Sequence, residues 1–532
     1  MTSTPTGDAA AAIQRRTHGL TDLDIPYELV VDLVLRRSFL DDTTSVGRLA
    51  EAIGLPVSVI SVVFEELNQK KFVDVQGLVG QDYVFTLTAF GKEQAAERFK
   101  RSKYSSVAPV SLGRYAKVVI AQRRRPQIRR DDVAQAFADL VVSDELIEQV
   151  GPAFTAQESL FLYGPSGTGK TSIGERLIRL YNDGILVPRA VEVDGQIITV
   201  FDPLVHHPVD PQPKGLDPRW VACFRPIVTV GGELELSMLQ LAFDQSRGTY
   251  TSPLQMRANN GILFIDDFGR QLTSPRALLN RWIVPLDRRV DYLTLEYGLK
   301  FSIPFELMVV FSTNLDPGDL KEDAFFRRIQ NKIYVGPVTD DQFDWIVTRA
   351  VQRYELEAKS GAMSYLRKVC RERGSGNLLA CYPNDLCRLA KAICEFQEGR
   401  PMLSTEAVDR AASLYFAEAG GGTGFFRRTL AEELSEHYER ADRRTPGQAA
   451  PPPSRTPRRP EEDHRDLQPA GSPPSEFPGD ETAVGDASGG EGPGGSAAGS
   501  GRSGVEAADP GAAVGRERRH AHGEIGDRRG PG

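Results

Sequence analysis

Apolar residues recur at helical spacing through the first hundred residues of the chain. The spacing predicts helices whose buried faces are formed by Leu29, Val30, Leu33 and Val34, then by Leu49, Ala50 and Ile53, and then by Val59, Ile60, Val63, Phe64 and Leu67. A tight turn at 54–56 joins the second and third of these helices. Two strands are expected at 72–75 and 83–88, joined by the polar turn 76–82, and a last helix at about 90–103. The pattern predicts a helix-turn-helix followed by a β-hairpin.

The pattern changes at about residue 131, where helical segments begin to alternate with apolar runs. Runs at 160–163, 262–265 and 307–311 are typical of strands buried on both faces. This alternation predicts an α/β domain with a parallel sheet. From 336 to 418 the spacing is helical again, and Thr339 with Gln342 predicts a capping box at the first of these helices.

The two ends of the chain lack a regular spacing of apolar residues and are distinguished by their composition. Residues 1–20 are small and polar, and a short helix-like stretch at 425–441 precedes a long tail. From 441 the chain is mainly Pro, Gly, Ala, Ser and charged residues, with Phe477 as its one Phe, Tyr or Trp. Such segments cannot bury enough apolar surface to fold, so we expect both ends to be disordered.

A phosphate-binding motif follows the apolar run at 160–163. The pattern G-x-x-x-x-G-K-T runs from Gly164 to Thr171 and opens a helix near Lys170. Glycines let the backbone approach a phosphate closely, and the N–H groups at the start of the helix point at anionic oxygens. A lysine here reaches the β- and γ-phosphates, and a threonine hydroxyl can bind Mg²⁺. The candidate ATP-binding residues are Gly164, Pro165, Ser166, Gly167, Thr168, Gly169, Lys170, Thr171 and Ser172.

Polar side chains stand at the ends of the two later strands. Asp266 and Asp267 follow the strand 262–265, and a carboxylate beside the P-loop can hold Mg²⁺ directly or through water. Asp266 fits this metal-binding role together with Thr171, and Asp267 is the candidate that polarises the attacking water. Asn314 follows the strand 307–311, which we expect between the two phosphate motifs, where its amide can orient that water.

This order of motifs resembles an AAA+ P-loop NTPase. The resemblance covers about 136–418 and implies ATP and Mg²⁺ as cofactors, a helical lid, and an oligomeric ring, which can be a hexamer. It implies that Asn314 is sensor 1 and that Arg327 or Arg328 is an arginine finger for the neighbouring subunit's ATP. Asp267 is shorter than the family's usual Glu, and the position of the lid's sensor 2 arginine is occupied by Asn384, with Arg388 one turn later.

Two hairpins narrow the resemblance to one branch. Strands at 292–295 and 300–303 about the turn 297–298 resemble the pre-sensor-1 hairpin of MoxR-like proteins. Two short β-like runs about 245–248 resemble that branch's insertion into its second helix, which touches substrates. Each hairpin is also consistent with an ordinary edge hairpin without a substrate role.

The N-terminal part resembles a winged helix. The second helix of its helix-turn-helix, which contains residues 59–67, presents Glu65 and Glu66. These acids are unfavourable opposite phosphates and favour a protein-binding or packing role over DNA binding. The segment 98–130 contains many Lys and Arg and no acid, as in a phosphate-binding strip or a basic linker that docks on an acidic neighbour. The expected organisation is disordered 1–20, winged helix 21–104, basic linker 105–135, AAA+ domain 136–335, lid 336–420 and tail 421–532.

Charge, cysteine content and apolar content narrow the classes of protein to which the chain can belong. The net charge of −8 over 532 residues does not suggest a bulk nucleic-acid binder. The five cysteines show no C-x-x-C pair, and we expect reduced thiols. We expect no membrane segment, no signal peptide and a cytoplasmic location. His206 and His207 lie in a proline-rich stretch without other converging ligands, so we expect them in a solvated loop rather than at a metal.

Three functions are compatible with these features. The first is a homo-oligomeric ATPase that remodels a protein client, recruited through the winged helix. The second is a DNA-directed ATP switch, such as a transcription regulator or a helicase-loader-like protein. The third is a nucleotide-binding scaffold with little turnover, suggested by Asp267 and Asn384.

Overall fold

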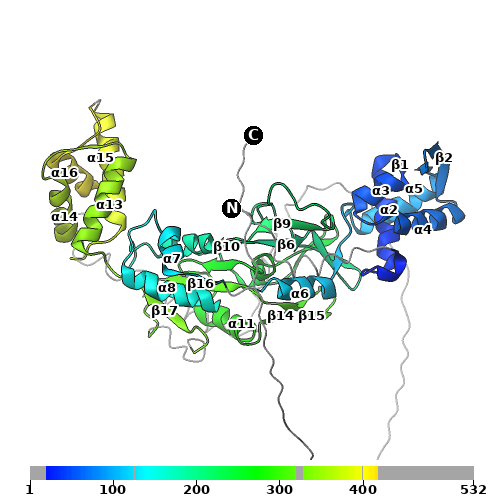
Figure 1. The fold of residues 1–532 in the computed structure, drawn as a ribbon, viewed down its shortest axis with the longest axis horizontal. Coiled ribbons are helices and arrows are strands. Elements are labelled where there is room, and N and C mark those ends of the chain that lie inside the picture. Colours follow the sequence, from blue (N-terminus) through cyan, green and yellow to red (C-terminus); the bar gives the residue numbers. More distant parts are fainter. Residues whose placement is uncertain (1–18, 124–125, 319–326, 375, 398, 417–532) are drawn as a thin grey trace, which may run out of the picture. The chain divides into compact units, whose positions relative to one another are not determined.

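A computed structural model describes residues 19–123, 126–318, 327–374, 376–397 and 399–416 (Figure 1). The N-terminal part comprises η1 (Leu20–Asp22), α2 (Tyr27–Asp41), β1 (Thr43–Ser45), α3 (Val46–Ile53), α4 (Val57–Gln69), β2 (Val73–Val79), β3 (Asp82–Leu87) and α5 (Ala89–Arg101). The three strands form an antiparallel sheet in the order β1-β3-β2. The predicted helices and hairpin are therefore present in the predicted order.

The hairpin is longer than the sequence indicated. The stretch 76–82 was expected to be a turn, but β2 continues through Leu78 and Val79 and pairs with β3 as far as Asp82. A register shift between Val75 and Gly77 absorbs one extra residue, so pairing resumes beyond the polar positions.

A five-stranded parallel sheet carries the nucleotide-binding motifs. Its order is β10-β13-β16-β5-β17, and every neighbouring pair is parallel. The strands are β5 (Leu160–Tyr163), β10 (Ile227–Val230), β13 (Ile262–Ile265), β16 (Met308–Thr313) and β17 (Asn331–Tyr334). Strand β16 lies between β5 and β13, as predicted for the strand that carries Asn314.

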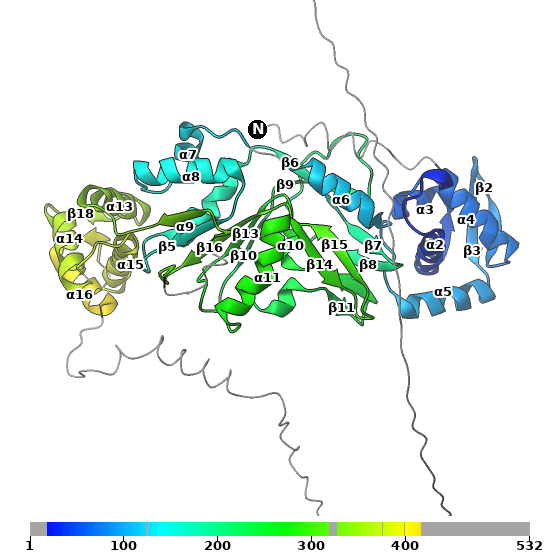
Figure 2. The same ribbon diagram turned by 90° about the horizontal axis from the view of Figure 1, so that it is seen from below.

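Helices cover both faces of this sheet (Figure 2). Alternate strand residues face opposite sides: Leu160 and Phe264 pack with Phe154 of α8, whereas Phe161 and Leu263 pack with Trp282 of α11. The flanking helices are α7 (Arg130–Ala136), α8 (Asp144–Ala156), α9 (Lys170–Arg176), η2 (Leu177–Leu180), η3 (Leu236–Leu239), α10 (Leu254–Arg257) and α11 (Pro275–Arg288).

A second five-stranded sheet occupies the region that was least readable from the sequence. Its order is β11-β12-β8-β7-β4, and a separate two-stranded antiparallel sheet pairs β6 with β9. The strands are β4 (Val110–Ser111), β6 (Gly184–Pro188), β7 (Ala190–Val193), β8 (Gln196–Thr199), β9 (Trp220–Phe224), β11 (Ala242–Asp244) and β12 (Thr249–Thr251). The hairpin predicted about 245–248 is β11 and β12, which lie between the short helices η3 and α10 and pair onto β8.

The hairpin before β16 is also present, as β14 (Val290–Thr294) and β15 (Lys300–Pro304). Leu293 and Leu295 are buried in the same core as the second sheet. At the hairpin tip, the Tyr297 hydroxyl donates a hydrogen bond of 2.7 Å to Asp194 in the turn between β7 and β8. The second sheet therefore holds this hairpin in place.

Two expectations for loops are wrong. The segment 105–135 was expected to be a linker, but it contains α6 (Leu112–Ala121), whose Tyr115 and Val118 are buried against the second sheet. His206 was expected in solvent, yet its ring is 1% exposed. Its Nδ1 accepts from the Asp202 amide at 3.0 Å and its Nε2 lies 2.9 Å from the Arg257 carbonyl, so the ring links its own loop to the end of α10.

A buried ion cluster connects the N-terminal part to this second sheet. Asp24 accepts hydrogen bonds from Arg219 at 2.7 Å and from the Ser111 amide at 3.1 Å. Arg219 is 1% exposed and also pairs with Asp217, which in turn lies 3.2 Å from Arg114. These contacts fix the position of the segment that precedes α2.

The C-terminal described region is helical, as predicted. It contains α13 (Asp340–Arg353), α14 (Ala362–Arg373), α15 (Cys381–Phe396) and α16 (Thr405–Tyr415), with β18 (Glu357–Ala358) paired to β19 (Met402–Leu403). The capping box is confirmed, because the Thr339 hydroxyl accepts from the Gln342 amide and the Gln342 side chain accepts from the Thr339 amide. These helices have a core of their own.

The expectations for 1–18, for the stretch 425–441, for the tail, and for a helix leading into Arg327 fall on residues outside those described. Among the described residues, we find no helix that is both long enough and apolar enough to span a membrane. All five cysteines are free thiols.

Candidate functional site

The P-loop connects β5 to α9 and requires glycine at three positions. Gly164, Gly167 and Gly169 have φ of 140°, 80° and 96°, values that side-chain-bearing residues rarely adopt. At Gly164 a Cβ atom would also lie 2.3 Å from the carbonyl oxygen of Val335. The glycines of the motif are therefore demanded by backbone conformation and by the close approach of β17.

The Lys170 ammonium is buried inside this loop. Its Nζ donates hydrogen bonds to the carbonyl oxygens of Gly164 at 2.9 Å and Pro165 at 2.7 Å. It donates a third to Oδ1 of Asn314 at 2.8 Å, which joins the P-loop to the end of β16. Burial lowers the pKa of Lys170, and the charge of Asp266 opposes that shift. These bonds hold the lysine at the position from which it can exchange carbonyl oxygens for phosphate oxygens.

Thr171 and Asp266 bring two oxygen ligands together beside the lysine. The Thr171 hydroxyl donates a hydrogen bond of 2.8 Å to Oδ2 of Asp266. The other carboxylate oxygen of Asp266 accepts from the Asp267 amide at 3.0 Å, which fixes the carboxylate plane. Hydroxyl and carboxylate oxygens are the ligands that Mg²⁺ prefers, so this pair fits a magnesium ion that also contacts phosphate.

Asp267 follows in a strained turn. Its φ of 47° lies in the left-handed region, which is uncommon for residues other than glycine. The turn is held because the Phe268 amide donates to the Ser312 carbonyl at 2.7 Å and the Gln271 side chain donates to the Asp267 carbonyl at 3.2 Å. The exposed Asp267 side chain therefore lines the same cleft as Asn314.

A cleft of about 940 Å³ extends from the P-loop to the helical region. This volume suits a nucleotide-sized ligand. Its lining combines polar loop residues and strand-end side chains with the apolar residues Leu140, Val141, Val142, Ile346 and Ala350. The polar residues suit phosphates, and the apolar residues suit a flat apolar group such as a base.

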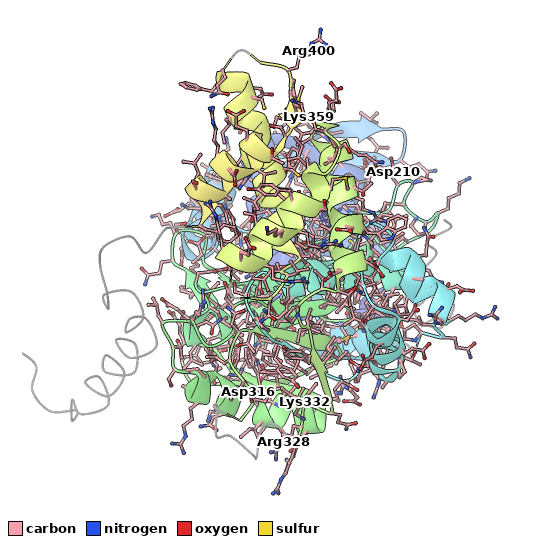
Figure 3. The ribbon with its side chains drawn as sticks, turned by 90° about the vertical axis from the view of Figure 1, so that its left-hand side faces the viewer. Asp210, Asp316, Arg328, Lys332, Lys359 and Arg400 are labelled. Atoms are coloured by element: carbon pink, nitrogen blue, oxygen red, sulfur yellow. The ribbon has the colours of Figure 1, made fainter. Side chains whose placement is uncertain are left out.

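The structure gathers most of the predicted site residues at this cleft. Those that line it are Ser166, Gly167, Thr168, Gly169, Lys170, Thr171, Ser172, Asp266, Asp267, Asn314 and Asn384. Gly164 and Pro165 contribute through their carbonyl bonds to Lys170. Arg327 and Arg328 are not among the lining residues, and Arg328 (labelled in Figure 3) forms an ion pair of 2.8 Å with Asp287 of α11.

Five charged residues of the cleft were not predicted from the sequence, namely Asp139, Arg176, Arg349, Arg353 and Asp385. Asp139 accepts hydrogen bonds from Arg176 at 3.1 Å, and its pKa is lowered by its contact with Arg179 and by the Arg176 charge, although burial opposes this. The pair ties the segment 138–142 to α9. Arg349 and Arg353 lie on α13. From the sequence alone, these two arginines are indistinguishable from a solvent-exposed helix face. The one available signal was spacing: Arg349 and Arg353 are four residues apart, as are Ile346 and Ala350, which places all four on one side of the helix.

The basic segment 98–130 gives little support to a phosphate-binding strip. Five of its described arginines are engaged by acids of the same chain, in the pairs Arg98–Asp32, Arg101–Glu97, Arg114–Asp217, Arg123–Glu306 and Arg130–Asp144. Within the described residues, His, Cys, Asp and Glu form no cluster of three or more that could hold a metal ion.

One protein-family model and several solved structures are similar to this chain. The model of a domain of unknown function, DUF8689, matches residues 339–414, the span of α13 to α16. No curated protein matches the chain. The chain resembles the solved Holliday junction branch migration motor RuvB of Thermotoga maritima, at 14% identity, with 60% of this chain and 80% of that chain covered and a TM-score of 0.30.

It also resembles NtrX from Brucella abortus in complex with ADP, at 13% identity, with 65% of this chain and 76% of that chain covered and a TM-score of 0.32. Similarities this distant carry no argument about activity. The assignment rests instead on the parallel sheet in the order β10-β13-β16-β5-β17, the P-loop after β5 and the helical region that follows β17. These define a P-loop NTPase fold of the AAA+ class with a helical lid.

Proposed function

We propose that the chain binds MgATP in this cleft and hydrolyses it. The observation that carries the proposal is that Lys170, hydrogen-bonded to Asn314 at 2.8 Å, and Thr171, hydrogen-bonded to Asp266 at 2.8 Å, line the same cleft. Lys170 would exchange its loop carbonyls for β- and γ-phosphate oxygens. Bound Mg²⁺, held by Thr171 and Asp266, would neutralise charge on the transferring phosphoryl group.

Asp267 and Asn314 are the proposed groups that act on water. Asp267 would accept the proton of the attacking water, and the Asn314 amide would orient that water once Lys170 turns toward phosphate. Positioning and electrostatic stabilisation supply most of the catalysis in phosphoryl transfer, so no covalent step on the protein is needed.

The Asp267→Asn variant tests the proposed base. Asp266 and Thr171 are untouched, so MgATP affinity should stay close to wild type while phosphate release falls to background. A variant that turns over at the wild-type rate would remove Asp267 from the mechanism. The same variant offers a trap, because an ATP-bound and hydrolysis-dead protein retains its client, which co-purification would then identify.

We further propose that the active form is a homo-oligomeric ring, which can be a hexamer, in which Arg327 or Arg328 reaches the neighbouring subunit's ATP. Neither residue lines its own cleft, which supports a role in trans. The Arg328 pair with Asp287 would have to open for Arg328 to act, so Arg327 is the simpler candidate. An arginine finger contributes roughly 10³–10⁵ in rate.

Mixing subunits distinguishes a finger in trans from one in cis. Arg327→Ala supplies an intact ATP site without the finger, and Lys170→Ala supplies the finger without an ATP site. Mixed oligomers should recover activity if the arginine acts between subunits. Absence of rescue at every mixing ratio would assign the arginine to its own subunit.

A chaperone-like remodelling ATPase of the pre-sensor-1 branch is the preferred role, with 21–104 as a winged-helix recruitment module. The hairpin β14–β15 and the hairpin β11–β12 support this branch. A DNA-directed ATP switch is the alternative, and the paired arginines of 98–130 give it less support. Stimulation of turnover by DNA, with a steep salt dependence, would favour the alternative.

A further inference from the structure

The first lid helix presents one stripe of side chains to the nucleotide cleft. Ile346, Arg349, Ala350 and Arg353 of α13 all line it, and their spacing places them along one face of the helix. Ile346 and Ala350 add apolar surface to the cleft, whereas Arg349 and Arg353 bring positive charge to it. Apolar and cationic side chains therefore alternate along the stripe, and Arg353 is its last member.

Arg353 stands near the position where the family places its lid arginine. That position is Asn384 at the start of α15, whose side-chain oxygen accepts a hydrogen bond of 3.2 Å from the Tyr354 hydroxyl. Tyr354 is the next residue after Arg353, so the Arg353 end of the stripe adjoins Asn384. Arg388, the other candidate, is absent from the cleft lining, is 65% exposed, and lies 3.6 Å from Asp385.

The other charges of the cleft already have partners within the chain. Asp139 is engaged by Arg176 and Arg179. Asp385 accepts from the Tyr415 hydroxyl at 3.1 Å and faces Arg388.

Burial lowers the pKa of Lys170, and the charges of Asp266 and Asp267 oppose that shift, so these three charges offset one another in part. By contrast, neither Arg349 nor Arg353 forms a hydrogen bond or an ion pair with any residue that the structure describes, and the one recorded contact is the Arg353 guanidinium 6.0 Å from the Tyr354 ring. Two uncompensated cations therefore face a cleft whose ligand is a polyanion.

We propose that Arg349 and Arg353 bind the phosphates of the nucleotide and supply the lid charge that Asn384 lacks. This inference rests on the proposed function and names the residues that couple the lid to the triphosphate. Arg353, which adjoins Asn384, binds the terminal phosphate. Arg349, one turn earlier on the helix, binds nearer the base and contributes to ATP and ADP alike.

The chemistry of guanidinium suits this role. It presents several N–H donors in a fixed plane and stays charged at every relevant pH, so it can engage two phosphate oxygens at once. A contact to the terminal phosphate exists with ATP and disappears with ADP. The lid would therefore be drawn onto the cleft by ATP and released after phosphate leaves.

The experiment measures equilibrium binding of MgATP and MgADP to the full chain by titration calorimetry. Arg353→Ala is expected to weaken MgATP binding by about tenfold to a hundredfold, the range for loss of a hydrogen bond to a charged group, and MgADP much less. Arg349→Ala should weaken both nucleotides to a similar extent. Arg353→Lys keeps the charge and should recover part of the ATP preference.

Two further arginine variants act as controls. Arg410→Ala removes an exposed lid arginine whose partner is Glu406 on α16, and it should bind both nucleotides like wild type. Arg388→Ala tests the rival assignment and should also leave the ATP preference unchanged. Because Arg349 and Arg353 are exposed and make no ion pair with a described residue, their variants should melt at the wild-type temperature without nucleotide.

Failure of the arginine assignment can be distinguished from failure of the proposed ATP binding. If wild type binds MgATP and Lys170→Ala does not, but the Arg349→Ala/Arg353→Ala double variant keeps the wild-type affinity for both nucleotides, the lid assignment is overturned and the ATP site stands. If Arg388→Ala alone loses the ATP preference, the assignment is likewise overturned. If wild type binds no MgATP, both proposals fall.

Discussion

Replacing Lys170 with Ala removes a side chain that three hydrogen bonds hold beside the P-loop. Its Nζ donates to the carbonyl oxygens of Gly164 and Pro165 and to the Asn314 side chain. In the nucleotide complex we expect at least two of these donors to move to β- and γ-phosphate oxygens. The substitution therefore removes ligand contacts without removing a ligand of the magnesium ion.

The size of the effect follows from the number of bonds. A hydrogen bond to a charged group contributes about 1.5–3 kcal/mol, so two such bonds amount to about 3–6 kcal/mol. Since each 1.4 kcal/mol is a factor of ten, MgATP should bind about 10²–10⁴-fold more weakly. MgADP keeps only the β-phosphate contact and should lose about half of that free energy.

Titration of a fluorescent ATP analogue measures the change directly. Lys300→Ala is the matched control, because Lys300 is an exposed lysine of β15 that does not line the cleft. The control should bind like wild type, and circular dichroism should be the same for all three proteins. Wild-type affinity in Lys170→Ala would refute the reasoning, since the bound phosphates would then lie elsewhere.

Three further predictions concern stability. His206→Ala should lower the free energy of unfolding by about 1–3 kcal/mol, because the Asp202 amide and the Arg257 carbonyl lose a buried partner. Burial lowers the pKa of His206, so its contribution is complete above about pH 6.5 and is lost as pH falls; denaturant melts should show the difference between wild type and His206→Ala shrinking toward pH 5. Burial raises the pKa of Asp24, but the Arg219 charge and hydrogen bonds outweigh this and hold it below its ordinary value. The excess stability of wild type over Asp24→Asn should therefore be full at pH 7 and disappear as pH falls below about 4, and a constant difference down to pH 2 would contradict that. Deleting 441–532 should leave the melting temperature and the ATPase rate unchanged, since its composition cannot support a core; calorimetry showing a large loss would disprove this.

The parts of the fold that the sequence predicted are those with strong local signals. Gly164, Gly167 and Gly169 permit the positive φ values of the P-loop, and their spacing before Lys170 is visible in the sequence itself. Strands β5 and β13 are continuous apolar runs, and the glycine-rich P-loop follows the first whereas Asp266 and Asp267 follow the second. Local chemistry was sufficient there.

The second sheet could not be predicted because its signals are not local. Strand β7 is buried on both faces, so it shows no polar alternation, and β4 is only two residues long and pairs with β7 across the intervening sequence. Burial of His206 depends on Arg257, 51 residues later. The same reason hid Arg349 and Arg353, since a polar helix face looks solvated until the tertiary structure places a cleft beside it.

Steady-state phosphate release from MgATP shows whether the P-loop cleft hydrolyses ATP. Wild-type protein should release phosphate with saturable dependence on MgATP, and turnover per subunit should rise with protein concentration as subunits assemble. Lys170→Ala, prepared in parallel, sets the background from contaminating enzymes. The account predicts release by wild type well above that background, and equal release by the two proteins at every concentration would contradict it.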